Sequence, residues 1–295
     1  MHGVLTLAGE GTRMLPWTRG LRKEFLPLYD HNPDGDPVLK PVAHLVLETL
    51  VEAGVDDVTL VVGAKDLAFV QNYFSIDQEF LARHSHHAER LATTRRFYRT
   101  LKGLRLRYAV QSAPLGFGDA VLQAEPYVGH SPFILHAADA VLLEPKRGAL
   151  LRTMSRLLEL ESSDAVLLVR RVADPTRYGV VEGIADGRFG GLPKLKVTGM
   201  EEKPKRPKSP WAATAAYAFS PKLFDALRWV QSNDHPRELE VTAAIQHLLS
   251  TGGRVSALVL TTRAGEWRSV GSPEGFARAL QRTRHRTRRA RARPA

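Results

Sequence analysis

The residues best suited to chemistry follow the first apolar stretch of the chain. Gly9 and Gly11 precede Arg13, and Lys23 lies ten residues further on. Glycines let the backbone approach a ligand closely, and the two cationic side chains supply charge that binds phosphates. A Walker A loop needs Gly-Lys-Ser/Thr, and a dinucleotide fingerprint needs a small residue where Met14 stands, so the segment matches neither. The glycine pair alone is also compatible with an ordinary tight turn.

Two downstream segments place polar side chains beside expected strand ends. Gln111 begins the run Gln-Ser-Ala-Pro-Leu-Gly-Phe-Gly, and its amide has the donor and the acceptor that pair with a pyrimidine. Asp139 follows the apolar run 133–137. Ligands of parallel sheets bind at this edge, and a carboxylate oxygen suits Mg²⁺. Each residue is also compatible with an ordinary loop, cap or turn.

Strands that alternate with helices would position these residues. Short β-branched runs predict strands at 4–7, 58–62, 104–110, 133–137 and 165–169. An apolar stripe over 42–53 predicts a helix that ends at Gly54, and residues 75–103 are expected to be helical, with Phe80 among the inward contacts. The alternation predicts an α/β fold, a Rossmann-like and mostly parallel sheet flanked by helices. From about Tyr178, shorter strands and proline-rich turns predict a smaller lobe.

Composition and charge narrow the class of protein. The 295 residues are 43% hydrophobic and 25% charged, as in ordinary globular proteins, and no run is long enough to cross a bilayer. Cysteine is absent and the N-terminus lacks a signal-peptide pattern, which predicts a cytoplasmic protein without a membrane partner.

The net charge of +11 is concentrated near the C-terminus. Eight arginines lie within residues 278–293, and about +3 remains without them. Residues 281–295 are expected to form a basic, disordered tail. We do not expect nucleic acid as a partner, because no aromatic residues are interleaved with these arginines.

The loop at 9–27 resembles the signature of sugar-1-phosphate nucleotidyltransferases, G-x-G-T-R-x-x-P followed by K-E/Q-x-L-P. The bacterial UTP glucose-1-phosphate uridylyltransferases are the most similar group, and matching segments extend over about residues 3–280. The resemblance implies transfer of a nucleotidyl group from a nucleoside triphosphate, UTP or dTTP, to a sugar 1-phosphate, with release of pyrophosphate. It also implies Mg²⁺ as cofactor, a homo-oligomer (dimer or tetramer), and one domain over 1–280, with a nucleotide-binding half over about 1–175 and a sugar-side half over about 176–280.

The resemblance assigns roles to individual residues. Arg13 and Lys23 are the catalytic cations that hold the triphosphate, and Asp139 is the metal ligand. The implied nucleotide contacts are Ala8, Gly9, Gly11, Thr12, Glu24, Gln111 and Gly116. The implied sugar-phosphate contacts, in the segments Tyr-Gly-Val and Glu-Lys-Pro, are Gly179, Glu202 and Lys203.

Four positions depart from the family pattern on the metal and sugar side. Ser269 and Ala243 stand where relatives usually have aspartate, Pro210 stands in place of an asparagine, and Ala215 in place of a glycine. Two interpretations remain open: an active enzyme with altered sugar specificity, or a catalytically weakened regulator that binds nucleotides or nucleotide sugars. Nucleic-acid binding through the arginine-rich segment is a third and weaker alternative.

Overall fold

The computed structural model describes residues 1–235 and 237–291. The strands are β1 (His2–Thr6), β2 (Pro27–His31), β3 (Pro37–Pro41), β4 (Asp57–Gly63), β5 (Arg105–Gln111), β6 (Phe133–Ala137), β7 (Ala140–Leu143), β8 (Ala165–Arg171), β9 (Gly179–Phe189), β10 (Leu192–Glu202), β11 (Trp211–Phe219), β12 (Val255–Val259) and β13 (Glu266–Ser269). The helices are α1 (Val42–Glu52), α2 (Leu67–Tyr73), α3 (Gln78–Arg83), α4 (Ala88–Lys102), α5 (Phe117–Leu122), α6 (Glu125–Val128), α7 (Ala149–Leu160), α8 (Lys222–Asp234), α9 (Val241–Ser250) and α10 (Pro273–Arg291).

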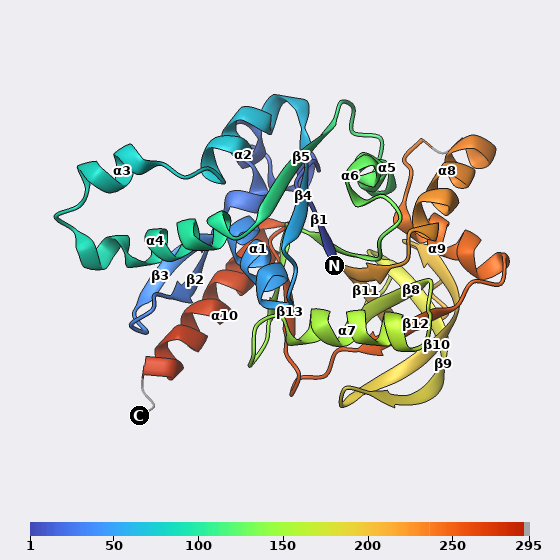
Figure 1. Cartoon of the computed structure of the whole chain (residues 1–295). Coiled ribbons are helices and arrows are strands. Elements are labelled where there is room, and N and C mark those ends of the chain that lie inside the picture. The colour runs from blue at the N-terminus through green and yellow to red at the C-terminus, as the bar shows by residue number, and fades with distance from the viewer. Residues whose placement is uncertain (236, 292–295) are drawn as a thin grey trace.

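One nine-stranded sheet runs through the molecule in the order β5-β4-β1-β6-β11-β8-β12-β10-β9 (Figure 1). The neighbours β5, β4, β1 and β6 pair in parallel, as the βαβ pattern predicts. β11 then pairs antiparallel with both β6 and β8, and β10 pairs antiparallel with β12 and β9. The α/β class is confirmed. The expectation of a mostly parallel sheet is corrected: the sheet is mixed, because parallel pairing is concentrated in the first half and β9, β10 and β11 pair antiparallel with their neighbours. The two halves share this sheet.

Both faces of the sheet are buried under helices. Neighbouring side chains of one strand point to opposite faces, and in β1 Val4 and Leu5 accordingly join two different apolar clusters. One cluster includes apolar residues of α1, α4 and α7, and the other includes those of α5, α8 and α9. Phe80, expected to point inward, is instead 37% exposed and its ring lies against His84. The short helix α3 therefore lies outside the main core.

The C-terminal segment corrects the expectation of a disordered tail over 281–295. α10 continues to Arg291 and packs along the hairpin β2–β3 (Figure 1). Thr283 and Thr287 are each only 2% exposed. The Thr283 hydroxyl accepts a hydrogen bond from the Tyr29 amide, and the Thr287 carbonyl oxygen lies 3.2 Å from His31 Nε2. Residues 32–36 form the turn of this hairpin, and the contacts from α10 hold the hairpin against the C-terminal helix. Residues 292–295 lie outside the described part.

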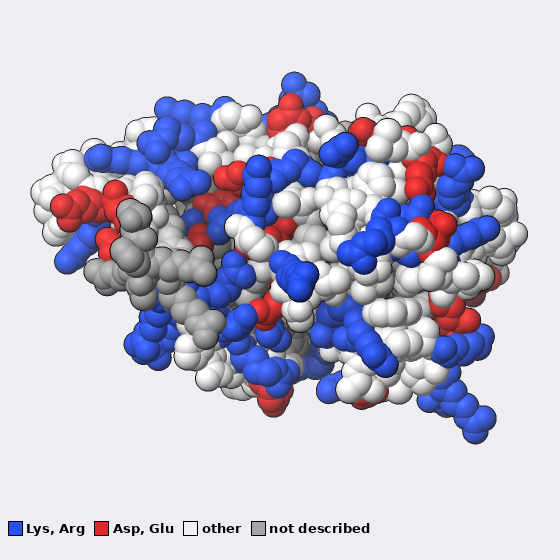
Figure 2. Space-filling view, turned by 90° about the horizontal axis from the view of Figure 1, so that it is seen from below, with Lys and Arg blue, Asp and Glu red and all other residues white. Residues whose placement is uncertain are grey.

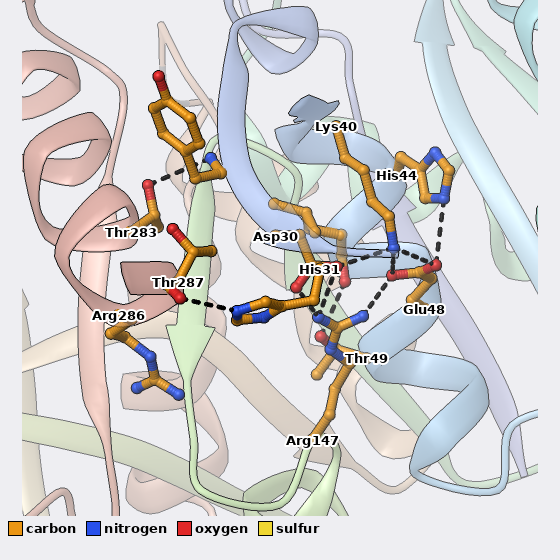
Figure 3. A network of polar contacts seen from close by, with 12 residues as sticks. Asp30, His31, Lys40, His44, Glu48, Thr49, Arg147, Thr283, Arg286 and Thr287 are labelled. Atoms are coloured by element: carbon orange, nitrogen blue, oxygen red, sulfur yellow. Dashed lines mark hydrogen bonds and ion pairs between the residues drawn. The ribbon is translucent and has the colours of Figure 1, made fainter. Parts of the chain in front are cut away.

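A network of buried charges fixes the same hairpin to the helical layer (Figure 3). Lys40 lies 2.8 Å from carboxylate oxygens of both Asp30 and Glu48. Arg147, which precedes α7, pairs with the same two carboxylates, and His44 lies 3.2 Å from Glu48. Burial opposes ionisation of Glu48, but His44, Lys40 and Arg147 outweigh it and hold the pKa of Glu48 well below its ordinary value. The network joins β2, β3, α1 and the segment before α7.

Charged side chains of both signs are spread over the face of the molecule that Figure 2 shows, where Lys and Arg are scattered among acidic and uncharged residues. Within the described ranges, no helix combines the length and the hydropathy that a bilayer span requires.

Candidate active site

A cavity of about 450 Å³ opens at the carboxyl ends of β1, β5 and β6. This edge is where parallel α/β sheets bind ligands. Every residue that the resemblance assigns to the nucleotide lines it: Ala8, Gly9, Gly11, Thr12, Glu24, Gln111 and Gly116. Lys23 and Asp139 line it too, whereas Arg13 lines a second cavity beside it. The sequence-predicted nucleotide residues are thus brought together.

The loop after β1 is shaped by a glycine and braced by a buried arginine. Gly11 has a φ of 67°, in the left-handed region that favours glycine, and a Cβ there would lie 2.9 Å from Thr18 Cγ2. The Thr18 hydroxyl donates to the Gly11 carbonyl at 2.9 Å. Arg22, 5% exposed, donates to the Leu7 carbonyl at 2.5 Å and lies 3.3 Å from Asp66. Sequence reasoning missed Arg22, because its partners lie far from it along the chain.

Lys23 lies between two carboxylates. Its ammonium donates to Asp139 Oδ2 at 2.6 Å and lies 3.8 Å from Glu24 Oε1. Burial disfavours ionisation of Asp139, but the Lys23 ammonium outweighs it and holds the pKa of that carboxyl below its ordinary value. Glu24 is only 2% exposed, and burial, countered in part by Lys23 and Arg22, raises its pKa to about 7.

Gln111 has a fixed orientation at the other wall of the cavity. Its Nε2 donates to the Gly116 carbonyl at 3.0 Å and to Asp119 Oδ2 at 2.7 Å. Because a carboxylate only accepts, the amide nitrogen must face Asp119. Both donors are therefore used, and the amide oxygen is the group left to contact a ligand. Gly116 has a φ of 110°, and a Cβ there would lie 2.4 Å from the Leu239 carbonyl oxygen, so no larger residue fits without moving that backbone.

The second cavity, of about 370 Å³, adjoins the first. Asp139, Phe117 and Ala215 line both cavities. Gly179 and Glu202 line the second one, as the resemblance implies. Lys203 is not among its lining residues, but its ammonium lies 3.0 Å from Glu202 Oε1.

The second cavity contains a further carboxyl group that sequence reasoning did not single out. Glu240 lines the second cavity, where burial and the neighbouring Glu202, opposed by Lys203, raise its pKa to about 7. Ala215, where the resemblance leads to the expectation of a glycine, has a φ of 54° and lies at a register shift of β11. The backbone there has the left-handed conformation that favours glycine.

The donors around Asp139 suit a metal ion that arrives with phosphates. Within residues 1–235 and 237–291, no group of three His, Cys, Asp or Glu side chains is placed to hold a metal. Ser269 pairs with Ala140 across β13 and β7, and a Cβ on Gly271 would lie 3.2 Å from both Ser269 Oγ and Asp139 Oδ2. Mg²⁺ is commonly bound by one or two carboxylates together with substrate phosphates. One carboxylate and a hydroxyl fit that mode.

Known proteins are similar to this chain over most of its length. The model of the nucleotidyl transferase family matches residues 2–286. A putative UTP–glucose-1-phosphate uridylyltransferase of Methanocaldococcus jannaschii is 31% identical over 83% of this chain and 81% of its own length. A glucose-1-phosphate thymidylyltransferase of Streptomyces antibioticus is 29% identical over 92% of this chain, which spans only 63% of that relative's length.

Solved structures agree on the fold. A structure of UDP-glucose pyrophosphorylase in complex with UDP-glucose superposes with a TM-score of 0.79 at 23% identity. The superposition covers 97% of this chain and 98% of the other.

Proposed function

The chain belongs to the nucleotidyl transferase family, and we propose that it transfers a nucleotidyl group from UTP or dTTP to a sugar 1-phosphate, giving an NDP-sugar and pyrophosphate. The observation that carries this proposal is the junction of the two cavities at Asp139. An enzyme that joins two substrates must hold their reacting atoms side by side. A nucleotide in the first cavity and a sugar phosphate in the second would meet at this residue.

The proposed reaction is an in-line displacement. An ionised oxygen of the sugar phosphate attacks the α-phosphorus, and a new P–O bond forms. The bond between the α-phosphorus and the oxygen that bridges it to the β-phosphorus breaks, and that oxygen keeps the electron pair and leaves with pyrophosphate. Because the attacking oxygen is already ionised, no protein base is needed, and catalysis rests on orientation and charge.

The cations at the junction would stabilise the charge of this transition state. Lys23 and Arg13 both lie close enough to stabilise the charge of Asp139 and would hold the triphosphate, while the backbone at Gly9, Gly11 and Thr12 would contact it. On the acceptor side, Lys203 would contact the sugar phosphate, and Glu202 with the Gly179 backbone would contact the sugar.

We propose Mg²⁺ as the cofactor, held by Asp139 and the substrate phosphates, with the Ser269 hydroxyl nearby. Bound there, it would supply positive charge to the phosphoryl oxygens. The role of Asp139 is to present a carboxylate whose ionised form is stabilised by Lys23.

The orientation of Gln111 supports the choice of base. Its free amide oxygen accepts a hydrogen bond, and uracil and thymine offer a ring N–H at position 3, whereas cytosine and adenine present ring acceptors on the corresponding edge. UTP and dTTP share this group, so both remain candidates.

The alternative function is a regulator that binds nucleotides without turnover. The hydroxyl of Ser269, in place of a second carboxylate beside Asp139, is the observation that favours it. A matrix of UTP, dTTP, CTP, ATP and GTP against several sugar 1-phosphates, assayed for pyrophosphate release, separates the two. Turnover with UTP or dTTP supports the enzyme, whereas tight nucleotide binding with no turnover in any combination supports the regulator.

Two properties of the protein as a whole complete the proposal. We propose a cytoplasmic location, supported by a sequence without cysteine, and a homo-oligomer, supported by the family resemblance. Light scattering after size-exclusion chromatography tests the oligomer, since a mass near the 32.7 kDa of one chain would contradict it.

A further inference from the structure

The cavity proposed for the acceptor is rich in arginine. Five guanidinium groups line it, together with three carboxylates: Arg13, Arg170, Arg177, Arg268, Arg278, Asp139, Glu202 and Glu240. Two of these carboxylates already have a cation, since Lys23 pairs with Asp139 and Lys203 pairs with Glu202. The cavity is therefore more positively charged than the binding of a neutral sugar ring requires.

Arg170 is the arginine whose surroundings are most specific. Its guanidinium lies 4.4 Å from the ring centre of Trp267 and 5.3 Å from that of Tyr178. One nitrogen donates to the Tyr178 hydroxyl at 3.3 Å, while Nε is buried with no hydrogen-bond partner among the described residues. No carboxylate in those ranges lies within ion-pair distance of it. Arg170 lines the cavity and its charge has no carboxylate partner among the described residues, so an anionic ligand in the cavity would supply one.

A second arginine adds to the same charge. Arg268 lies close enough to Arg170 to disfavour its charged form, and its own Nε is also buried without a partner in the described part of the chain. Glu266 pairs with both Arg268 and Arg282, so one carboxylate serves two guanidinium groups. An anion bound between Arg170 and Arg268 would relieve their repulsion.

The phosphate common to all sugar 1-phosphates does not account for Arg170. Arg170 stacks on Trp267, whereas the positively charged groups that act on Asp139 include Lys23 and Arg13 and not Arg170. Lys203 is the cation proposed for the sugar phosphate.

We propose that the acceptor is a sugar 1-phosphate that carries a second anionic group, a carboxylate or a second phosphate, and that Arg170 binds this group. This inference rests on the proposed function and names its substrate class. A planar guanidinium held between aromatic rings presents a fixed edge that suits a carboxylate or phosphate, and lysine lacks this geometry. A neutral sugar would leave the charge of Arg170 without an anionic partner in the cavity.

The test compares three acceptors with the nucleotide that turns over: glucose 1-phosphate, glucuronic acid 1-phosphate and glucose 1,6-bisphosphate. We expect kcat/KM for at least one acidic acceptor to exceed that for glucose 1-phosphate by about 10-fold or more. A preference for glucuronic acid 1-phosphate identifies the anion as a carboxylate, and a preference for the bisphosphate identifies it as a phosphate. Equal or better use of glucose 1-phosphate overturns the proposal.

Variants assign the preference to Arg170. Arg170→Gln should lower kcat/KM for the acidic acceptor by a factor about 10-fold larger than any loss with glucose 1-phosphate. Arg170→Lys should be intermediate. Arg171→Gln is the matched control, because this neighbour in β8 is exposed and does not line the cavity. An equal loss with acidic and neutral acceptors would mean that Arg170 contacts the phosphate that all acceptors share, or that it only stabilises the fold. Either result would overturn the proposal.

If no acceptor turns over, the proposed function fails but the acceptor site is still tested. Calorimetry in the presence of UTP then compares binding of the same three sugar phosphates to the natural protein and to Arg170→Gln. Tighter binding of an acidic sugar phosphate that depends on Arg170 supports the inference. Equal binding of all three contradicts it.

Discussion

The ammonium of Lys23 lies 2.6 Å from Oδ2 of Asp139, although the two residues are 116 positions apart in the chain. One belongs to the loop after β1 and the other follows β6, and these two strands are neighbours in the sheet. The pair sits where the two cavities meet. The proposed catalytic cation is thus held in place before substrate binds.

Lys23→Ala is expected to lower kcat/KM by about 100-fold or more, because it removes a fixed positive charge from the place where charge develops in the transition state. Lys23→Arg keeps the charge with a different geometry and should lose less. Steady-state kinetics measure both, with the exposed Lys102→Ala as control. Near-normal turnover of Lys23→Ala would contradict the proposed catalytic role of this residue.

Glu24 predicts a pH-dependent stability. Its pKa is raised from an ordinary 4.5 to about 7 in the folded protein, so folding favours the protonated form. That contribution is present below about pH 4.5 and is lost as the pH rises through 7, with a total of about 3 kcal/mol at most. Urea unfolding between pH 4.5 and 8 should show this loss in the natural protein and not in Glu24→Gln. The exposed Glu79→Gln serves as control, and parallel curves for the natural protein and Glu24→Gln would contradict the prediction.

Ser269→Asp adds a carboxylate beside Asp139. If Mg²⁺ is held there mainly by Asp139 and phosphates, the added charge should lower the Mg²⁺ concentration for half-maximal turnover by roughly 5-fold or more, since such a charge is worth about 1 kcal/mol or more. Ser85→Asp adds the same charge at an exposed position outside both cavities. An unchanged requirement in a folded Ser269→Asp variant would mean that the side chain lies outside the reach of the metal.

Ala215→Gly tests the strain at a position where φ is 54°. A residue with a side chain in the left-handed region is strained by about 1–2 kcal/mol, and glycine removes this strain. Glycine also loses more conformational entropy on folding than alanine does, which lowers stability by about 0.5–1 kcal/mol. The variant should therefore be as stable as the natural protein, or more stable by up to about 1 kcal/mol. Ala82→Gly inside α3 should lose about 1 kcal/mol. Equal losses of Tm in the two variants would argue against strain at Ala215.

The predictable parts of the molecule are those encoded locally. The run 133–137 forms β6 with the predicted bounds, and the loop glycines lie in the predicted cavity, because strand period and turn chemistry depend on neighbours in the chain. Arg170 and Trp267, whose side chains stack, are 97 positions apart in the chain. This contact depends on the tertiary fold, and the local sequence around either residue does not predict it.

The C-terminal helix was predictable in part. Ala279, Thr283 and Thr287 recur every four residues and form its buried face. The eight arginines near the C-terminus are typical of a solvated, charged segment. Threonine is mostly exposed in proteins, so its recurrence is a weak indication of a buried helix face. The expectation of disorder therefore overlooked a helical period.

The most direct test of the central claim follows the α-phosphorus. UTP labelled with ³²P at the α-position, and separately at the γ-position, is incubated with the protein, Mg²⁺ and the acceptor selected from the sugar 1-phosphate panel. Nucleotidyl transfer predicts that the α-label appears in a sugar nucleotide and the γ-label in pyrophosphate, in equal amounts, and that Asp139→Asn slows both together. Release of the γ-label as inorganic phosphate, or retention of both labels in tightly bound UTP, would contradict the proposed reaction.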